Sequence, residues 1–554
     1  MEEFKKLFLF PFLIGIIGGF SAIFVRIIIH YSVFLSDGIS YFTTQRYFYL
    51  FAVPAIFVLS SFVIRYFLSD ATNPTIDSVA KSITLKKGRL DYKKGVLSVI
   101  LTAVNIGLGT PVGREGPIAK FGGSLTHLFL KIFKTEGANV PLFVTCGVSS
   151  ALAATFNAPV AGIVFGLEIV LGRLNFNVIV PLAVSSAIAT LVSRHFLGDY
   201  PTFYVHKMYY DSVFLFLIPI FSLAFASIVI FFNTLHKSFK YFYRKISAPF
   251  YFRALFGGLI VGFLIFLFPD VASLGYTQVS SLFSLNYSFE DSFTLSIIKV
   301  LALAITFASG IFGGIFAPSI FIGAFLGFAV GGFTGHFISI DPLSVALIGT
   351  AAVTAGISSA PFRSSLIIIE LTQNYQMAVP ILLSSVTTLY FVHIFEEKIH
   401  FTRTVMQKGF DISDKAYAKK LKKMNIVNFV ETDIPVLRKN AIIKDVMFEI
   451  MNSSSSYFPV VEEEKLIGVL SFRDIRLMYN KNDYLKTTIG ELMTKNPSAL
   501  TLSSNGLDVF EFISHIEANY IPVINGEEKK YIGMLNVMSF SKFVSFVYLK
   551  KEEI

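Results

Sequence analysis

The residues best suited to chemistry lie in Gly113-Arg114-Glu115-Gly116-Pro117, where a carboxylate and a guanidinium stand within a strongly apolar region. A glutamate at membrane depth is costly unless it is paired, protonated or in contact with water, so such a residue points to function. Pro117 predicts a helix that starts just after Glu115. Free N–H groups at a helix start attract anions. The stretch therefore predicts a site for which Glu115 and a dissolved anion compete, or alternatively a structural salt bridge between Glu115 and Arg114.

The composition of the whole chain indicates a membrane protein. Of its 554 residues, 54% are hydrophobic and 15% are charged, and residues 7–25 carry no charged side chain. Such a segment can cross a hydrocarbon core of about 30 Å. The net charge of +10 is concentrated in residues 81–94 and 236–253, together with Lys5 and Lys6. By the positive-inside rule these segments face the cytoplasm, so the charge indicates topology and lipid contact rather than nucleic-acid binding.

Motif and cysteine content argue against an enzyme. The chain has no Gly-x-Ser-x-Gly, His-Glu-x-x-His or P-loop pattern, and its histidines form no cluster, so we expect no catalytic residue and no metal site. The single cysteine, Cys146, excludes intrachain disulfides and is interpreted as a small packing residue.

Two internal repeats place the charged stretch opposite a partner. Gly147, Pro159 and Glu168 correspond to Gly349, Pro361 and Glu370 at a shift of 202 residues, and Pro117 corresponds to Pro318 at a shift of 201. Many apolar segments are too short to cross a bilayer, a pattern typical of transporters built from broken helices. We therefore expect two helix starts, at 113–117 and 313–318, to meet at one central site. Ile315 and Phe316 would contribute backbone N–H groups there.

Beyond about residue 400 the sequence becomes mixed α/β. Tyr457-Phe458-Pro459-Val460-Val461 with Ile467-Gly468-Val469-Leu470 resembles Tyr520-Ile521-Pro522-Val523-Ile524 with Ile532-Gly533-Met534-Leu535, the second spacing being two residues longer. Each copy is interpreted as helix, strand, turn, strand and helix. The predicted boundaries are 1–400 for the membrane domain, 401–430 for a linker, and 431–485 and 486–554 for the two copies.

These motifs resemble the CLC family of chloride channels and proton-coupled chloride transporters. The motifs in question are Gly-Arg-Glu-Gly-Pro at 113–117, Asn-Ala-Pro-x-Ala-Gly at 157–162 and Gly-Gly-Ile-Phe-Ala-Pro at 313–318. The C-terminal part resembles a tandem CBS (cystathionine-β-synthase-type) pair. The resemblance implies an all-α polytopic membrane domain with inverted repeats and broken helices, followed by a cytoplasmic α/β CBS module. It also implies a homodimer with one anion pathway per subunit, in which Glu115 is the gate.

The resemblance also names the residues that line the anion pathway. Gly113, Arg114, Gly116, Ile315 and Phe316 match the two helix-start motifs. Two further positions follow from alignment with the family, and at both the chain departs from the family pattern. Ala71 stands where an anion-contacting serine is expected, and Thr72 or Asn73 would supply a polar group instead or cap a helix starting at Pro74. Phe401, or His400 beside it, stands where a tyrosine is expected.

The acidic pair that carries protons in many exchangers of the family is also incomplete. Glu168 falls at the first acidic position and is a candidate for a proton path, but Ile169 falls at the second and cannot carry a proton. Glu168 and Glu370 occupy the same repeat position, which favours a scaffold role in which each carboxylate bonds backbone at a helix end. We keep both interpretations of Glu168 open.

The first CBS copy carries Ser471-Phe472-Arg473-Asp474, which fits the family's nucleotide-binding pattern. In that pattern the aspartate bonds the ribose and the hydroxyl approaches phosphate. The second copy offers Asn536 to Ser539 without an aspartate, so at most one complete site is implied. We expect no required cofactor, and either an adenine nucleotide (ATP, ADP or AMP) in the CBS pair or a purely structural dimerisation module.

The expected function is transport of small inorganic anions, chloride foremost, in a channel-like or weakly proton-coupled manner. The alternatives are a proton/chloride antiporter, a fluoride- or other-anion-selective variant, and a nucleotide sensor that no longer conducts. We expect a multi-pass protein with both termini in the cytoplasm, in the plasma membrane of a prokaryotic cell.

Overall fold

The structure is a computed structural model, and it describes most of the chain. The described residues are 5–42, 45–68, 79, 83, 88–135, 139–171, 176–206, 208, 210–245, 249–395, 421, 424–453, 455–472, 474–475, 487–506, 508–509, 512, 520–526, 530–537 and 539–540. Contacts divide the chain into two units, Met1–Glu396 and Glu397–Ile554, and each is described by itself.

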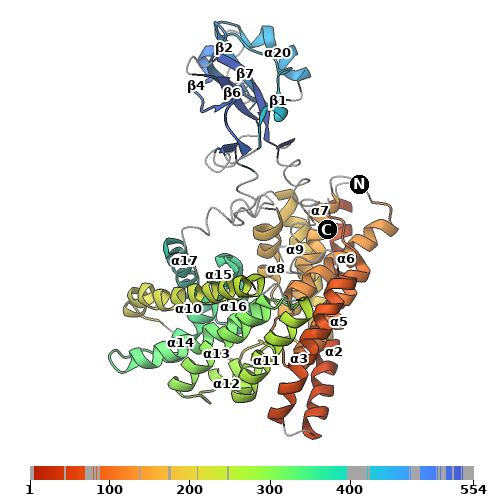
Figure 1. The fold of residues 1–554 in the computed structure, drawn as a ribbon, viewed down its shortest axis with the longest axis vertical. Coiled ribbons are helices and arrows are strands. Elements are labelled where there is room, and N and C mark those ends of the chain that lie inside the picture. Colours follow the sequence, from red (N-terminus) through yellow and green to blue (C-terminus); the bar gives the residue numbers. More distant parts are fainter. Residues whose placement is uncertain are drawn as a thin grey trace. The chain divides into compact units, whose positions relative to one another are not determined.

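The first unit is helical throughout its described length (Figure 1). Its first half contains α2 (Phe10–Phe42), α3 (Gln45–Phe67), α5 (Tyr92–Gly107), α6 (Glu115–Ile132), α7 (Val140–Phe156), α8 (Pro159–Phe165) and α9 (Phe176–Leu197). Its second half contains α10 (Ser212–Lys245), α11 (Phe250–Leu267), α12 (Tyr276–Phe283), α13 (Phe289–Ala308), α14 (Phe316–Gly335), α15 (Pro342–Ser358), α16 (Pro361–Thr372) and α17 (Ala378–Phe395).

The two halves are structural repeats. Corresponding helices begin at residues 10 and 212, 115 and 316, 140 and 342, 159 and 361, and 176 and 378, so each pair differs by 201 or 202. Their packing is also repeated: a Cβ added to Gly122 would strike the carbonyl of Gly147, and one added to Gly323 would strike the carbonyl of Gly349. Small residues at such contacts let two helices approach closely. The repeat expected from the sequence is therefore present in the fold.

Both repeats contain the same broken helix. α7 ends at Asn157 and α15 at Ser359, each in the left-handed conformation with φ of 55° and 52°. Pro159 and Pro361 then open α8 and α16. Asparagine tolerates left-handed backbone and proline suits a first turn, so the local sequence dictates the break. The short, interrupted helices predicted from the sequence are confirmed.

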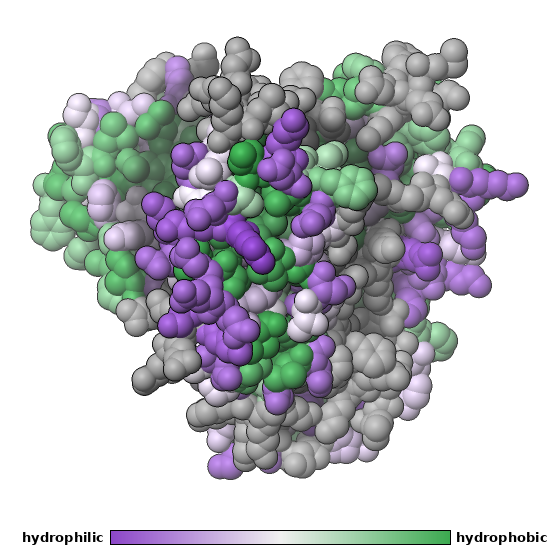
Figure 2. All heavy atoms as spheres, turned by 90° about the horizontal axis from the view of Figure 1, so that it is seen from above, coloured by the Kyte–Doolittle hydropathy of each residue, from purple (hydrophilic) through white to green (hydrophobic). Residues whose placement is uncertain are grey.

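The surface of the helical unit is that of a membrane protein. Among the described residues, eight helices are long and apolar enough to span a bilayer. Large apolar side chains on them are exposed, for example Phe216 on α10 at 83% and Phe51 on α3 at 77%. Figure 2 shows hydrophobic residues along the margin where the ends of α10 and α14 lie, as lipid contact requires. The protein is therefore a multi-pass membrane protein.

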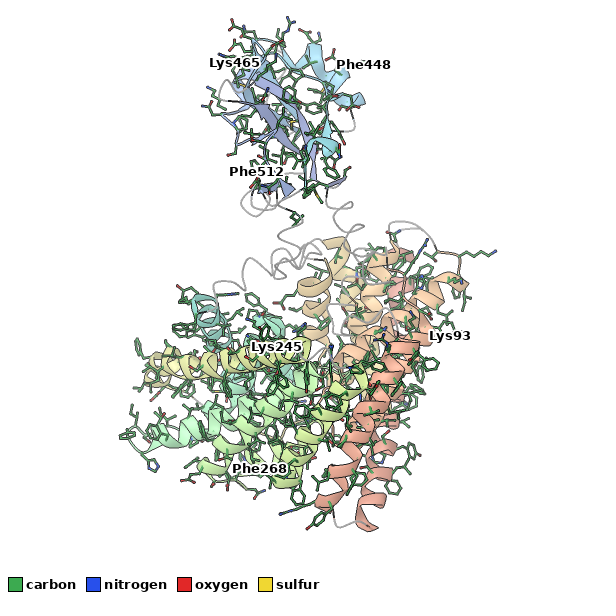
Figure 3. The ribbon with its side chains drawn as sticks, viewed as in Figure 1. Lys93, Lys245, Phe268, Phe448, Lys465 and Phe512 are labelled. Carbon is green, nitrogen blue, oxygen red and sulfur yellow. The ribbon has the colours of Figure 1, made fainter. Side chains whose placement is uncertain are left out.

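Two lysines in the basic connections lie at helix ends. Lys93 is in the first turn of α5 and Lys245 is the last residue of α10, and both are exposed (Figure 3). These are the segments that the positive-inside rule assigns to the cytoplasm.

The second unit is built around one mixed sheet. Its elements are β1 (Val430–Glu431), α20 (Ile443–Asn452), β2 (Tyr457–Glu462), β3 (Lys465–Ser471), α22 (Ile489–Leu492), β4 (Thr494–Lys495), β5 (Leu500–Thr501), β6 (Tyr520–Asn525) and β7 (Lys530–Asn536). The strand order is β2-β3-β7-β6-β5, with β1 on β7 and β4 on β3. Two hydrophobic cores form, one around Phe458 and Leu470 and the other around Ile521 and Leu535.

The two halves of this unit repeat the same hairpin. β2 and β3 pair antiparallel with Val460 opposite Gly468 and a bulge after Val460, and β6 and β7 pair with Val523 opposite Gly533 and a bulge after Val523. The first turn consists of Glu463 and Glu464, both at positive φ, as a tight two-residue hairpin requires. β6 ends at Asn525 and β7 begins at Lys530, so this connection is two residues longer than the first, which is the extra spacing seen in the sequence.

Candidate functional site

The two predicted helix starts meet through their glycines. The N–H of Gly113 donates to the carbonyl of Gly314, and the N–H of Gly314 donates to the carbonyl of Gly113, both at 2.6 Å. Because each residue makes the bond that the other makes, the contact has local twofold symmetry, as in an isologous interface. The sequence-predicted convergence of 113–117 and 313–318 is thus observed, and it brings Gly113, Arg114, Glu115, Gly116, Ile315 and Phe316 together.

The helices that leave this junction begin slightly earlier than the prolines suggest. α6 starts at Glu115 with Arg114 at the N-cap, and α14 starts at Phe316 with Ile315 at the N-cap. The prediction of a start just after Glu115 is therefore wrong by about one position. Pro117 and Pro318 occupy the third helical position instead, where an N–H would also lack an intrahelical partner. Glu115 is consequently part of the first turn, and its own N–H belongs to the helix start.

The Glu115 carboxylate lies between the two helix starts. The residue is 2% exposed, and its carboxylate lies close to the backbone N–H groups of Arg114, Glu115 and Ala317. None of these meets hydrogen-bond geometry, so both carboxylate oxygens are without a hydrogen-bond partner among the described residues. Ala317 is in the first turn of α14, so N–H groups of both repeats face one carboxylate. An anion placed there would meet the same donors.

The two glycines leave the space that the carboxylate occupies. A Cβ added to Gly113 or to Gly314 would collide with Oε2 of Glu115. Glycine is therefore required at both positions, because a side chain there would occupy the place of the Glu115 carboxylate. The anion-binding role of Gly113 stays a prediction.

Arg114 does not pair with Glu115 among the described residues. Its guanidinium carbon lies 5.7 Å from the centre of the Tyr276 ring, within the range of a cation–π contact, and its Nε has no hydrogen-bond partner among the described residues. The structural salt bridge considered from the sequence is therefore not formed. Arg114 instead leaves a positive charge beside the junction.

A buried polar chain holds the backbone on both sides of the junction. Ser60 Oγ on α3 donates to Asn105 Oδ1 on α5 at 2.6 Å, and Asn105 Nδ2 donates to the carbonyl of Phe312 at 3.1 Å. Asn105 is fully buried. Its amide therefore ties α5 to the segment that precedes the second helix start, which fixes the distance between the repeats.

A buried lysine anchors the segment that leads into α12. Lys299 on α13 is 0% exposed, and its Nζ donates to the carbonyls of Val271 at 2.7 Å and Ser273 at 2.9 Å. Ser273 in turn donates from its N–H to the carbonyl of Gly109 and from its Oγ to the carbonyl of Ile106. The lysine thus connects α13 to the end of α5 through this segment.

The paired glutamates make reciprocal helix caps. Oε1 and Oε2 of Glu370 accept from the N–H groups of Val160 and Ala161, in the first turn of α8. Oε2 of Glu168 accepts from the N–H of Arg363, the position in α16 that corresponds to Ala161. Each carboxylate therefore holds the start of the broken helix of the other repeat, which is the backbone bonding expected of a scaffold role. Buried Arg363 lies over the Phe165 ring at 5.0 Å, in the same contact.

Some predicted pathway residues lie outside the described residues. These are Ala71, Thr72 and Phe401, together with Asn73 and His400. Of Ile169, only the backbone is described. Their roles remain predictions.

The predicted nucleotide residues bond to one another. Oδ2 of Asp474 accepts from the N–H of Ser471 at 2.9 Å and from its Oγ at 2.7 Å, directly after β3. At the matching place after β7, Oδ1 of Asn536 accepts from the N–H of Ser539, and its Nδ2 donates to Glu431 Oε1 at 2.7 Å. The first copy thus offers a hydroxyl and a carboxylate at these two positions, and the second offers an amide and a hydroxyl, with the amide bonded to Glu431 of β1, the strand that pairs with β7.

The second copy is also more acidic around its tyrosine. Asn536 Nδ2 lies 3.2 Å from Tyr520 Oη. Partial burial, together with Glu431 and Asp433, raises the pKa of the Tyr520 phenol. A phosphate placed here would face negative charge, so this copy is the less suitable one for a nucleotide.

Sequence reasoning missed three residues of the helical unit. Lys299 is a lone charge within an apolar segment, so the rule that identified Glu115 would also have identified it. Asn105 lies near the end of an apolar segment, and its partner Phe312 is 207 residues away. Local sequence patterns therefore do not predict this contact. Tyr276 lies in a short helix whose position beside Arg114 follows from tertiary packing alone.

Family comparison agrees with this geometry. The sequence profile of the voltage gated chloride channel family matches residues 55–393, and that of the CBS domain matches residues 426–480. The chain is 27% identical over 349 residues to a putative chloride channel protein ClcB-like of Ralstonia nicotianae, covering 61% of this chain and 80% of that one. It is 27% identical over 349 residues to the H(+)/Cl(-) exchange transporter ClcA of Salmonella arizonae, covering 60% and 74%.

Solved structures share the fold. A eukaryotic CLC transporter superposes with a TM-score of 0.66 at 19% identity, covering 96% of this chain and 97% of that one. A CLC-type fluoride/proton antiporter superposes with a TM-score of 0.61 at 18% identity, covering 71% and 96%. At these identities the likeness concerns the fold.

Proposed function

Because the chain belongs to the voltage gated chloride channel (CLC) family, we propose that its helical unit carries chloride or a similar small inorganic anion past Glu115, which acts as the gate. The observation that supports this most directly is the position of the Glu115 carboxylate, which faces N–H groups from both α6 and α14. Those donors suit any small anion, so an ionised Glu115 excludes a permeant anion from the same place.

The gate works through competition for a limited set of donors. With Glu115 ionised, the carboxylate neutralises the positive ends of two helices and a second negative charge is repelled. Protonation or displacement of Glu115 frees the donors for an anion. Neither carboxylate oxygen has a hydrogen-bond partner of good geometry among the described residues, so the closed state lacks the bonds that would hold Glu115 in place.

We propose channel-like or weakly proton-coupled flux. Glu168 supports this because its carboxylate is engaged as a helix cap at Arg363, and Ile169 stands at the second acidic position. The second candidate is a proton/chloride antiporter, which is favoured by the similarity to the exchange transporter of Salmonella arizonae. In that case Glu168 would belong to the proton path despite its role as a cap.

The identity of the anion is proposed from the family, with chloride first. Ala71 and Phe401 replace two polar side chains that the family directs at the anion, so backbone N–H groups carry more of the recognition. A fluoride-selective pathway is the alternative, and an anion series decides between them.

For the rest of the molecule we propose a homodimer with both termini in the cytoplasm of a prokaryotic cell. The exposed Lys93 and Lys245 support this orientation. An adenine nucleotide is proposed to bind the first CBS copy at Ser471 and Asp474.

The test is flux from proteoliposomes with simultaneous recording of external pH, using chloride, bromide, nitrate and fluoride in turn. We expect chloride efflux with little proton movement. Uphill proton transport driven by a chloride gradient would instead identify an antiporter. Absence of flux for all four anions would overturn the transport proposal and favour a non-conducting nucleotide sensor.

A further inference from the structure

Buried polar groups without hydrogen-bond partners gather at the junction. They include the Glu115 carboxylate, Arg114 Nε, the hydroxyl of Tyr276 and the hydroxyl of Thr110, three residues before Gly113, none of which has such a partner among the described residues. Buried polar groups are normally bonded, so a cluster of unbonded ones calls for an explanation. The proposed function accounts for Glu115 and leaves Tyr276 without a role.

The Tyr276 hydroxyl is a donor close to a movable acceptor. The Arg114 guanidinium lies over the Tyr276 ring at 5.7 Å, and Arg114 directly precedes Glu115 in the chain. Phe203 packs edge-on against the ring at 5.4 Å and 86°, which restricts its tilt. The ring is therefore held beside the residue that precedes the gate, although Glu115 points to the backbone N–H groups in the observed state.

The position of Tyr276 is fixed by buried contacts. It is the first residue of α12 and follows Gly275, which has φ of 82° and leaves no room for a Cβ beside the Phe321 ring. The preceding segment is bonded by Lys299 to α13 and by Ser273 to Gly109 and Ile106. Gly109 lies four residues before Gly113. The hydrogen bond from Ser273 to Gly109 therefore connects the segment before Tyr276 to the segment that leads to Glu115.

We propose that the Tyr276 hydroxyl is the hydrogen-bond donor that receives the Glu115 side chain when the gate leaves the junction. In the closed state both groups lack partners, and in the open state each would satisfy the other beside the Arg114 charge. Opening therefore gains a hydrogen bond that closing does not offer. Lys299 acts as a positioning residue for this donor. The inference rests on the proposed gating role of Glu115.

The test is Tyr276→Phe, which removes the hydroxyl and keeps the ring. We expect chloride efflux to fall by about threefold to tenfold, the effect of one hydrogen bond. Tyr243→Phe is the matched control, since it also removes a buried tyrosine hydroxyl, but one that is already paired with Ser309 Oγ at 3.1 Å. This control is expected to leave efflux unchanged.

A double mutant tests whether the Tyr276 hydroxyl bonds Glu115 or contacts the anion. In a Glu115→Ala background there is no carboxylate to receive, so Tyr276→Phe is expected to have no further effect. A further fall in that background would show that the hydroxyl contacts the anion instead, and would overturn the proposal. The same holds if Tyr276→Phe alone leaves efflux at the level of the unmodified chain. Loss of flux in the unmodified chain would refute the proposed function itself.

A structure of Glu115→Gln provides a second readout that does not depend on flux. Glutamine mimics the neutral side chain, and its Oε1 is expected to accept from Tyr276 Oη at about 2.7–2.8 Å. A glutamine that stays between Gly113 and Gly314, or that turns away from Tyr276, would overturn the proposal.

Discussion

Gly113 and Gly314 exchange two backbone hydrogen bonds of 2.6 Å, one in each direction, and the Glu115 carboxylate occupies the space that their missing side chains leave. The same two residues therefore join the repeats and make room for the side chain of Glu115, the proposed gate. Each helix start supplies N–H groups, but neither alone would surround a small anion, so an anion site at this junction requires both helices.

Gly314→Ala should open the gate by steric displacement. The added Cβ would collide with Oε2 of Glu115 and crowd its N–H, so the carboxylate can no longer stay between the helix starts. We expect chloride efflux that depends less on pH than in the unmodified chain. Gly38→Ala, at a helical position where the added carbon meets nothing within 4 Å, serves as the control. Unchanged pH dependence in Gly314→Ala would contradict this placement of the carboxylate.

Glu115→Gln should remove the pH dependence of flux. The amide is neutral at all pH values, so it cannot compete electrostatically with an anion, whereas the unmodified chain should conduct better as pH falls and Glu115 is protonated. At neutral pH we expect efflux to rise by about tenfold, equivalent to about 1.4 kcal/mol. The exposed Glu290→Gln, in the first turn of α13, tests whether loss of any carboxylate has this effect. A Glu115→Gln protein that keeps the original pH profile would remove Glu115 from the gate.

The sequence was sufficient to predict the broken helices and the meeting of 113–117 with 313–318, because proline, glycine and asparagine dictate local backbone and the repeat spacing pairs the breaks. It also predicted the repeated hairpins around Gly468 and Gly533. It placed the start of α6 about one residue too late, since a proline is tolerated throughout the first turn and does not mark its first residue.

The parts that escaped prediction are contacts between distant segments. The N–H of Ala317, in the second repeat, lies close to Glu115, and this depends on how α14 approaches α6. Tyr276 contacts Arg114 because Lys299 holds the segment that precedes it. No periodicity along the chain predicts this contact. Such contacts follow from tertiary packing, which local sequence patterns do not contain.

Lys299→Met should destabilise the helical unit. The carbonyls of Val271 and Ser273 would lose their donor while remaining in the protein interior, and hydrogen bonds from charged groups contribute about 1.5–3 kcal/mol each. We expect the free energy of unfolding in detergent to fall by about 2–4 kcal/mol. Lys93→Met, at the exposed end of α5, should change it by less than about 0.5 kcal/mol. Equal melting of the two variants would show that the buried bonds add nothing.

The reciprocal caps predict that two glutamates stabilise the helical unit. Glu370→Ala removes hydrogen bonds to the first turn of α8, and Glu168→Ala removes a hydrogen bond to the first turn of α16, so both variants should lower thermal stability. Glu168→Gln keeps one acceptor oxygen for Arg363 and is expected to leave the ratio of anion to proton flux unchanged. If Glu168→Gln abolished a proton flux that the unmodified chain shows, Glu168 would be part of a proton path.

Asp474→Asn should weaken nucleotide binding by the first CBS copy. The carboxylate already accepts from the N–H and the hydroxyl of Ser471, which holds it at the end of β3, and an amide offers a ribose hydroxyl a weaker acceptor. Calorimetry on the full chain is expected to show ATP binding at one site per chain and a loss of about tenfold in affinity for the variant. Ser539→Ala, at the matching position after β7, should bind as the unmodified chain does, because Glu431 and Asp433 make that copy unfavourable for phosphate. Two sites per chain, or equal affinity in Asp474→Asn, would show that the nucleotide binds elsewhere.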